Sequence, residues 1–120
     1  MDDLKHYEFE NDGDVLIVVA RASLSSAVDT DLVADRHRLV DHISGLGITQ
    51  VVVDFRRVTH FASSVLNTLT HLWNSQRTAG GRMAICSLSQ LASETISMAG
   101  LDSIFDLCPT QSEALARVRT

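Results

Sequence analysis

Residues 51–53, three valines in a row, constrain the fold of this chain more than any other feature of its sequence. β-Branched side chains restrict χ1 and favour an extended backbone. An apolar run without alternating polar residues is typical of a strand that is covered on both faces, as in a parallel sheet. Asp54 and Phe55 follow the run, and we expect Asp54 to end the strand and to hold the loop that comes after it.

The spacing of apolar residues changes after this loop. They recur at three- and four-residue steps, which predicts one buried face of a helix. The residues concerned are Val65, Leu66, Leu69, Leu72 and Trp73. Ser63 and Ser64 precede this pattern, and the Ala-Gly-Gly of residues 79–81 predicts its end. The central segment therefore predicts a strand, a loop and a helix, with the two serines where the helix begins.

The N-terminal part of the chain predicts a hairpin. Residues 7–10 alternate weakly between apolar and polar, and residues 15–20 form a second apolar run. The intervening Asn-Asp-Gly-Asp of residues 11–14 tolerates the left-handed conformations of tight turns. We therefore expect an antiparallel pair of strands that joins an otherwise parallel sheet.

A helix is expected after this hairpin. Ser26 and Asp29 predict an N-terminal capping box, and Gly45 and Gly47 predict the end of the helix. The expected apolar stripe consists of Val28, Leu32, Leu39, Val40 and Ile43. The charged residues expected largely on the outer face are Asp31, Asp35, Arg36, Arg38 and Asp41.

The rest of the chain continues to alternate between strands and helices. Residues 83–86 and 104–107 predict strands. Ser89 predicts the start of a helix that ends at Gly100. Thr110 and Glu113 fit a capping box, which predicts a last helix. Such alternation implies right-handed parallel crossovers. The prediction is one α/β domain over residues 1–120, with about four to five strands and about four helices.

Composition excludes several classes of function. The chain has 120 residues and a formal charge of -5, which allows one core and does not predict binding to nucleic acid. No apolar run approaches the roughly 20 residues that cross a bilayer, and the start of the chain is acidic where a signal peptide is basic. Cys86 and Cys108, in a predicted strand and a predicted loop, are too few for a disulfide framework or a zinc site. These features predict a cytoplasmic protein with reduced thiols.

Ser63 and Ser64 allow two interpretations. Serine is a favoured N-cap, because its oxygen accepts a hydrogen bond from a free N–H group of the first helical turn. The same position favours an anion, because the N–H groups and the helix dipole are positive there. A phosphorylated serine is therefore tolerated at this point, and the residues alone leave both interpretations open.

No catalytic or metal site is expected. Ser63, His60 and Asp54 are close in sequence, but no G-x-S-x-G motif surrounds the serine. The other histidines have no spacing typical of metal ligands, and all five are expected on the surface. These other histidines are His6, His37, His42 and His71. We expect neither enzyme activity nor a cofactor.

Two segments resemble a known family: VVVDFRRVTHFASSVLNTL and AGGRMAICSLSQLASETISMAGLDSIFDL. The order of elements in these segments is similar to that of the STAS domain of bacterial anti-sigma factor antagonists. It consists of a strand ending in Asp, a loop, a serine pair, a helix ending in Gly-Gly, a strand, a helix and Gly-Leu-Asp. The resemblance extends from about Val15 to Val118. The family motif is Asp-Ser-Ser/Thr-Gly-Leu, and here Ala62 stands in place of its Asp and Val65 in place of its Gly.

The resemblance implies the STAS fold, with a mostly parallel core and an N-terminal antiparallel hairpin, and a regulatory binding function. Such an antagonist binds an anti-sigma factor that is also a serine kinase of the histidine-kinase-like ATPase family, and phosphorylation of a serine ends the interaction. The family's phosphoacceptor falls on Ser63, with Ser64 as the alternative. The implied partner-binding residues are Ser25, Ser26, Ser63, Ser64, Val65 and Asn67. Nucleic-acid binding and membrane insertion are not implied, and a homodimer is left open.

Because Ala62 lacks the carboxylate of the family motif, other hypotheses about the function are also considered. A STAS scaffold that works without phosphorylation, in a stress-sensing complex or in lipid-transport machinery, does not need the missing carboxylate. Alternatively, Asp54 takes the place of that carboxylate if the loop folds back. A small-molecule sensor is a third hypothesis, for which the sequence shows no recognisable pocket.

Overall fold

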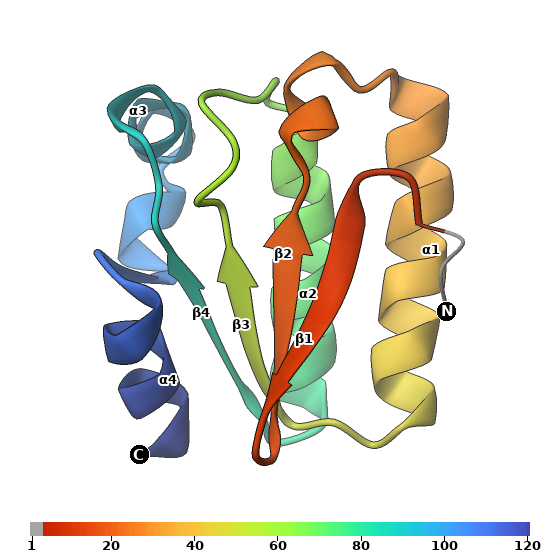
Figure 1. Cartoon of the computed structure of the whole chain (residues 1–120), viewed down its shortest axis with the longest axis vertical. Helices are drawn as coiled ribbons and strands as arrows, with labels where there is room; N and C mark the ends of the chain where they lie inside the picture. The colour runs from red at the N-terminus through yellow and green to blue at the C-terminus, as the bar shows by residue number, and fades with distance from the viewer. Residues whose placement is uncertain (1–3) are drawn as a thin grey trace.

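A five-stranded sheet in the order β1-β2-β3-β4-β5 forms the centre of the molecule, as the computed structural model in Figure 1 shows. The structure describes residues 4–120. The strands are β1 (Tyr7–Asp12), β2 (Val15–Ala20), β3 (Gln50–Asp54), β4 (Arg82–Cys86) and β5 (Asp106–Cys108). β1 and β2 are antiparallel, whereas β2 to β5 are parallel. The predicted hairpin and the predicted parallel core are both confirmed.

In residues 4–120, four α-helices cover the two faces of this sheet. They are α1 (Asp29–Gly45), α2 (Val65–Thr78), α3 (Gln90–Met98) and α4 (Gln111–Arg119), and two short 3₁₀ helices are η1 (Ala22–Ser26) and η2 (Leu101–Ser103). Buried residues of α1, α2 and α3 form one apolar core with Val51 and Val53 of β3. Buried residues of α4 form a second core with Val52. Successive side chains of a strand point to opposite faces, so the valine run is buried on both sides, as predicted.

The expected apolar stripe of α1 is wrong at two positions. Val28 is 59% exposed, because α1 begins only at Asp29 and Val28 is its N-cap. Asp35 is 1% exposed, because it lies three residues after Leu32 and four before Leu39, on the buried face of the helix. Its carboxylate accepts hydrogen bonds from the backbone N–H groups of Lys5 and His6, at 3.1 and 3.0 Å. A buried carboxylate is therefore satisfied by the backbone that precedes β1.

Two further predictions about polar residues are wrong in the same part of the chain. Ser26 does not cap α1, because it is the last residue of η1. His6 is not on the surface but 8% exposed, and its Nδ1 lies 2.9 Å from the hydroxyl oxygen of Ser23. Both differences arise from η1, which the sequence pattern did not predict.

The turns differ from the predictions by one or two residues. β1 continues to Asp12, so the hairpin loop consists only of Gly13 and Asp14, and Gly13 has the φ of +57° that this tight turn requires. The last strand is residues 106–108 and not 104–107, because η2 and the following turn occupy residues 101–105 and place Phe105 in the core. Cys108 is consequently in a strand and not in a loop.

The predicted end of α2 is confirmed. Gly80 has a φ of +75°, which ends the helix, and Gly81 has no space for a side chain, since a Cβ there would lie 2.3 Å from the carbonyl oxygen of Thr49. The predicted caps of the last two helices are also confirmed. Ser89 accepts a hydrogen bond from the N–H of Ala92, and Thr110 accepts one from the N–H of Glu113.

Candidate functional site

The two serine-containing loops lie at the same end of the sheet. η1, with Ser25 and Ser26, follows β2, and the loop with Ser63 and Ser64 follows β3. β2 and β3 are parallel neighbours, so both loops leave the carboxyl ends of adjacent strands, at the top of Figure 1. Loops at this edge of a parallel sheet commonly form binding sites. The candidate site is this edge and the first turn of α2.

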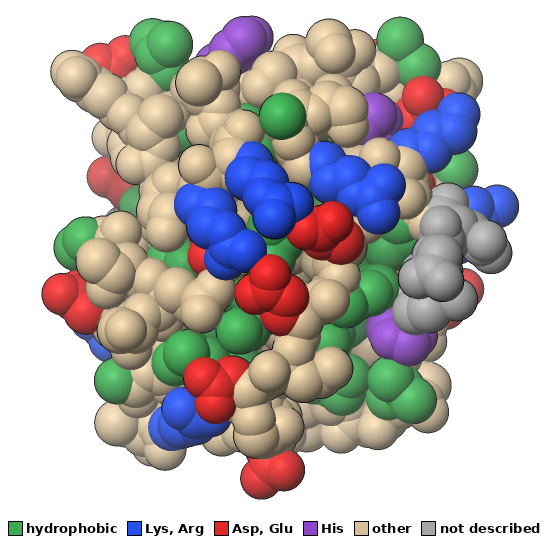
Figure 2. Space-filling view, viewed as in Figure 1, with side chains coloured by type: hydrophobic (Ala, Val, Ile, Leu, Met, Phe, Trp, Pro, Cys, Tyr) green, Lys and Arg blue, Asp and Glu red, His purple; other side chains and the backbone are tan. Residues whose placement is uncertain are grey.

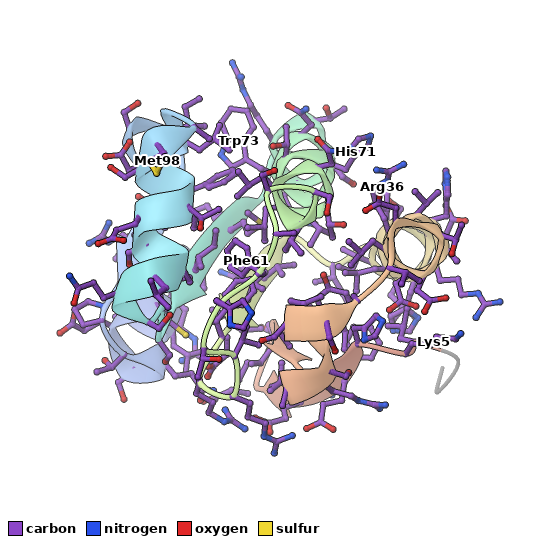
Figure 3. The ribbon with its side chains drawn as sticks, turned by 90° about the horizontal axis from the view of Figure 1, so that it is seen from above. Lys5, Arg36, Phe61, His71, Trp73 and Met98 are labelled. Atoms are coloured by element: carbon purple, nitrogen blue, oxygen red, sulfur yellow. The ribbon has the colours of Figure 1, made fainter. Side chains whose placement is uncertain are left out.

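Buried side chains hold the loop between β3 and α2 in place. Phe55, Val58 and Phe61 are at most 4% exposed, and the rings of Phe55 and Phe61 lie 5.2 Å apart between centroids. Figure 3 looks down on this end and places Phe61 near the middle of the molecule, between α3 and α1. The hydroxyl of Ser89, which caps α3, donates a hydrogen bond to the carbonyl oxygen of Thr59. The loop is therefore held by its own buried side chains and by a hydrogen bond from the N-cap residue of α3.

Asp54 ties the start of this loop to the opposite face of the sheet. Its side chain is fully buried, and its Oδ1 accepts a hydrogen bond from the N–H of Arg56 at 2.8 Å. Its Oδ2 accepts hydrogen bonds from Arg56 Nη1 at 3.0 Å and from Gln111 Nε2, on α4, at 2.9 Å. The expectation that Asp54 ends the strand and holds the loop is confirmed.

The hypothesis that Asp54 replaces the carboxylate missing at Ala62 is wrong. Asp54 points to the α4 face, where it contacts Gln111, whereas Ser63 precedes α2 on the other face. No hydrogen bond joins Asp54, His60 and Ser63 among the residues that the structure describes, and His60 Nδ1 instead lies 3.3 Å from the hydroxyl of Thr59. The sheet therefore separates Asp54 from Ser63.

Neither serine caps α2 with its side chain, so the predicted N-cap hydrogen bond is wrong. Ser64 has helical dihedral angles, with φ of −61°, and its hydroxyl makes no cap hydrogen bond. The first N–H groups of the helix bond instead to backbone carbonyls three residues earlier, from Val65 to Ala62 at 3.0 Å and from Leu66 to Ser63 at 3.0 Å. Ser63 is exposed, and within residues 4–120 its hydroxyl has no hydrogen-bond partner.

The partner-binding residues expected from the sequence are not all on the surface. Ser26 and Asn67 are exposed, and Ser25 and Ser64 are half-buried. Val65 is 1% exposed and belongs to the core, so it is not available to a partner. The apolar periodicity that placed Val65 on the buried face of α2 was the correct indication.

A hollow of about 180 Å³ between α1 and α2 adjoins Ser64. It is lined by Asp29, Leu32, Val33, Arg36, Ser64, Asn67 and Thr68. Asp29 and Arg36 bring one negative and one positive side chain from α1 to the start of α2. Sequence reasoning missed both, because residues so far apart in the chain meet only when the helices pack.

A network of ion pairs covers the sheet beside this loop. Arg57 pairs with Glu8, Arg21 Nε lies 3.7 Å from Glu8 Oε2, and Arg56 Nη2 lies 2.8 Å from Glu10 Oε2. Figure 2 shows these charges gathered over the upper half of the sheet. The hydrogen bond with Glu10 raises the pKa of Arg56 further above its usual range. The arginines of the loop are thus neutralised by β1 and do not form a free anion site.

The two thiols lie side by side beneath the α4 face. Cys86 of β4 and Cys108 of β5 are partners in the register of the sheet, and both are buried and unoxidised. Burial raises the pKa of the Cys86 thiol to about 12 and also raises the pKa of Cys108. In the described part of the chain, residues 4–120, no three His, Cys, Asp or Glu side chains cluster as metal ligands. Nor does any helix there have the length and apolarity to cross a bilayer.

The fold and the site define a class: an α/β module that presents a serine at the carboxyl edge of a mixed sheet, between two helices. The STAS domain family matches residues 6–114, and the chain therefore belongs to that family. Ala62 and Val65 are departures from its motif within a fold that is otherwise maintained.

Several solved structures have similar folds. A STAS domain anti-sigma-factor antagonist from Planctomyces limnophilus is 20% identical to this chain in sequence. Its structure matches with a TM-score of 0.82, and the match covers 95% of this chain and 98% of that chain. The unphosphorylated anti-sigma factor antagonist SpoIIAA is 17% identical, with a TM-score of 0.77, and the match covers 94% of this chain and 96% of that chain. A Bacillus SpoIIAA in its phosphorylated form is also similar, with 17% identity and a TM-score of 0.68, and the match covers 94% of this chain and 99% of that chain. A chain of a stressosome structure is 16% identical in sequence, with a TM-score of 0.75. The match covers 93% of this chain and 96% of that chain. These likenesses show a shared fold.

Proposed function

We propose that this protein is an anti-sigma factor antagonist that binds an anti-sigma factor with serine kinase activity, and that phosphorylation of Ser63 ends the interaction. The observation that carries the proposal is the exposed Ser63 hydroxyl, which is not used for capping. The exposed or half-buried residues around it form the contact surface, and they are Ser25, Ser26, Ser64 and Asn67. The protein acts by binding and not by catalysis.

The physical basis is the charge of a phosphate. Phosphorylation adds about −1.5 to −2 charges at neutral pH. At Ser63 the start of α2 and its dipole tolerate this charge within the protein. A partner surface that packs closely on an uncharged serine has to desolvate the phosphate, which weakens the complex. Membership of the STAS family and the phosphorylated form of the similar SpoIIAA support this model.

The surroundings favour Ser63 over Ser64 as the acceptor. Ser64 is half-buried and lines the hollow that also contains Asp29, and a phosphate there would meet a carboxylate of like charge. Ser63 is exposed and does not line this hollow.

The test is a binding measurement with the anti-sigma factor kinase. We expect Ser63→Asp to weaken binding by about tenfold or more, whereas Ser63→Ala should bind like the unmodified protein and resist dissociation when ATP is added. Ser112→Asp is a matched control, because Ser112 is an exposed serine in the first turn of α4. Peptide mass spectrometry after incubation with the kinase should locate the phosphate on Ser63. Equal affinities of Ser63→Asp and Ser63→Ala would rule out the switch.

A second function, a scaffold that works without phosphorylation, is favoured by Ala62. The family's carboxylate is absent at this position, and Asp54 points to the other face of the sheet. A subunit of this kind would assemble with other STAS proteins in a stress-sensing complex or with lipid-transport proteins. A complex that forms from native cells and is unaffected by Ser63→Asp would support the scaffold and not the switch.

A further inference from the structure

A groove lies at the edge of β4, at the end of that strand opposite to the serine loops. The pairing of β4 with β5 begins at Ala84 and Asp106, so within residues 4–120 no strand lies beside Arg82 and Met83 of β4 on this side. The groove has a volume of about 270 Å³. It is lined by Trp73, Gln76, Arg77, Gly81, Arg82, Met83 and Asp106. An unpaired strand edge is a template for pairing with another chain.

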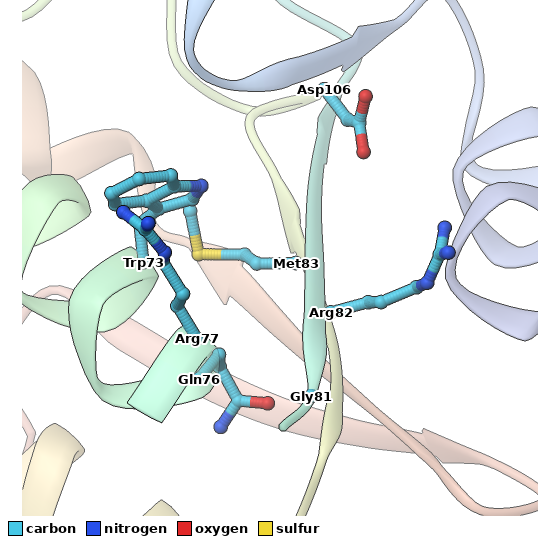
Figure 4. A pocket seen from close by; sticks show the side chains of 7 residues that line it. All are labelled: Trp73, Gln76, Arg77, Gly81, Arg82, Met83 and Asp106. Atoms are coloured by element: carbon cyan, nitrogen blue, oxygen red, sulfur yellow. The ribbon is translucent and has the colours of Figure 1, made fainter. Parts of the chain in front are cut away.

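The side chains around this edge form two walls. In Figure 4, Trp73, Arg77 and Met83 lie on the α2 side of β4, and Arg82 extends to the opposite side. The difference follows from the strand, since Arg82 and Met83 are successive residues and point to opposite faces. Met83 is 4% exposed and gives the α2 wall an apolar base.

Neither arginine of the groove has an acidic partner in the described part of the chain. The guanidinium of Arg77 lies 5.1 Å from the ring centroid of Trp73, but within residues 4–120 neither Arg77 nor Arg82 forms an ion pair. Asp106 is already paired with Arg117, at 3.2 Å. Most other basic side chains are also in ion pairs, namely Lys5, Arg21, Arg56, Arg57, Arg117 and Arg119. The groove therefore has two cations available to an anionic partner.

Gln76 lies behind the same wall and holds it in place. Its side chain is 2% exposed, and its Nε2 donates to the carbonyl oxygen of Ile48 at 3.0 Å. Its Oε1 is buried without a donor among the described residues. Buried polar atoms without a partner are uncommon in folded proteins. This oxygen lies against Gly81, since a Cβ there would be 2.7 Å from it, so Gln76 supports the start of β4 from within and does not contact a bound segment.

We propose that this groove binds an extended segment of a partner protein, which adds to β4 as a short strand and carries acidic side chains on two successive residues. Successive side chains of an added strand point to opposite faces. One acidic residue then reaches Arg77 on the α2 side, and the next reaches Arg82 on the other side. A small carboxylate contacts only one of the two cations at a time. The site is independent of the Ser63 switch, because it lies at the amino end of β4.

The test is titration with the capped peptide acetyl-Val-Glu-Asp-Val-Glu-Thr-amide. Trp73 is the only tryptophan in the chain, so its fluorescence reports directly on the groove. We expect a saturable change, and about tenfold weaker binding of the neutral peptide in which Gln and Asn replace Glu and Asp. By calorimetry, Arg77→Gln and Arg82→Gln should each weaken binding about threefold to tenfold. The control Arg38→Gln, a change of the same charge on α1, should leave the affinity unchanged.

Further measurements separate strand addition from simple charge attraction. Hydrogen exchange of the Met83 amide should slow when the peptide binds, and N-methylation of alternate peptide amides should abolish binding. Equal binding of the N-methylated peptide, or displacement of the peptide by equimolar succinate, would overturn the proposal. So would the absence of binding to the acidic peptide. Ser63→Asp should not affect this titration, so the failure of one proposal is distinguishable from the failure of the other.

Discussion

The two faces of the sheet are built differently. Three helices cover one face, and its core includes large apolar side chains from every part of the chain, such as Tyr7, Leu69 and Phe105. One helix covers the other face, where the core is smaller and includes Cys86 and Ala114. Beyond α4 this second face is covered by the ion pairs of Glu8 and Glu10 with arginines of the neighbouring loops.

The difference explains why the candidate site is on one side only. The three-helix face provides apolar anchors under the serine loop, so that Ser63 is presented by a well-packed support. The single-helix face contains the polar groups that bind the start of that loop, above all Asp54. Asp54 is close to the serines in the sequence, but the fold places its carboxylate away from them. There it stabilises the start of the loop.

The largest expected effect is a cavity in the three-helix core. Leu69 is 1% exposed, and Leu69→Ala should lower the free energy of unfolding by about 2–5 kcal/mol. Leu115→Ala on α4 is the matched change on the other face, where the side chain is 8% exposed, and should cost less. Urea denaturation of both variants measures the difference. Equal losses would contradict the contrast between a large and a small core.

A smaller loss is expected when the polar anchor of the second face is removed. Asp54→Ala leaves the amide of Gln111 and the backbone N–H of Arg56 without their acceptor, which should cost about 1–3 kcal/mol. Asp54→Asn keeps an acceptor of the same shape and should lose less. Urea denaturation gives both values, and faster hydrogen exchange in residues 56–62 would show that the loop has loosened. An Asp54→Ala variant of unchanged stability would mean that the apolar anchors hold the loop alone.

The smallest effect concerns the thiols and appears only at high pH. Burial raises the pKa of Cys86 from 9.0 to about 12, so the folded protein keeps a proton that the unfolded chain releases. The free energy of unfolding should therefore fall as the pH rises from 9.0 towards about 12, with a slope of at most about 1.4 kcal/mol per pH unit from this group.

Cys86→Ala should reduce this slope, and the comparison requires urea denaturation at several pH values in the presence of a reductant. Tyr7 contributes in the same direction, because burial also raises its pKa, so Tyr7→Phe is the control from the three-helix face. An unchanged slope in Cys86→Ala would show that the thiol does not determine the alkaline stability of the second face.

Local patterns were sufficient to predict most of the elements. Four such patterns depend only on residues that are neighbours in the chain, and the structure confirms each of them. They are the run of valines, the helical spacing after Ser64, the Gly-Gly sequence that ends α2, and the caps at Ser89 and Thr110. The resemblance to the STAS domain rested on the same local order and is confirmed over residues 6–114.

Apart from the caps expected at Ser26 and at the serine pair, predictions failed where a side chain depends on residues far away in the sequence. Asp35 is buried because the backbone N–H groups of Lys5 and His6 reach it, and no helical pattern indicates such donors. Cys86 and Cys108 are isolated in the sequence but become neighbours when β5 pairs with β4. The edge groove with Arg77 and Arg82 was likewise not recognisable, because it exists only where β5 begins later than β4.

The sequence by itself determined the order of strands and helices, the family and the position of the serine pair, because periodicity, turn residues and caps act over a few neighbouring residues. Only the tertiary structure decided which face of the sheet each polar group occupies. It placed Asp54 on the face opposite to Ser63, brought Asp29 to the hollow beside Ser64, and left Arg77 and Arg82 without an ion pair among residues 4–120. The physical reason is that packing and burial join residues that are distant in the chain, and these contacts decide whether a charge is neutralised, hidden or free to bind.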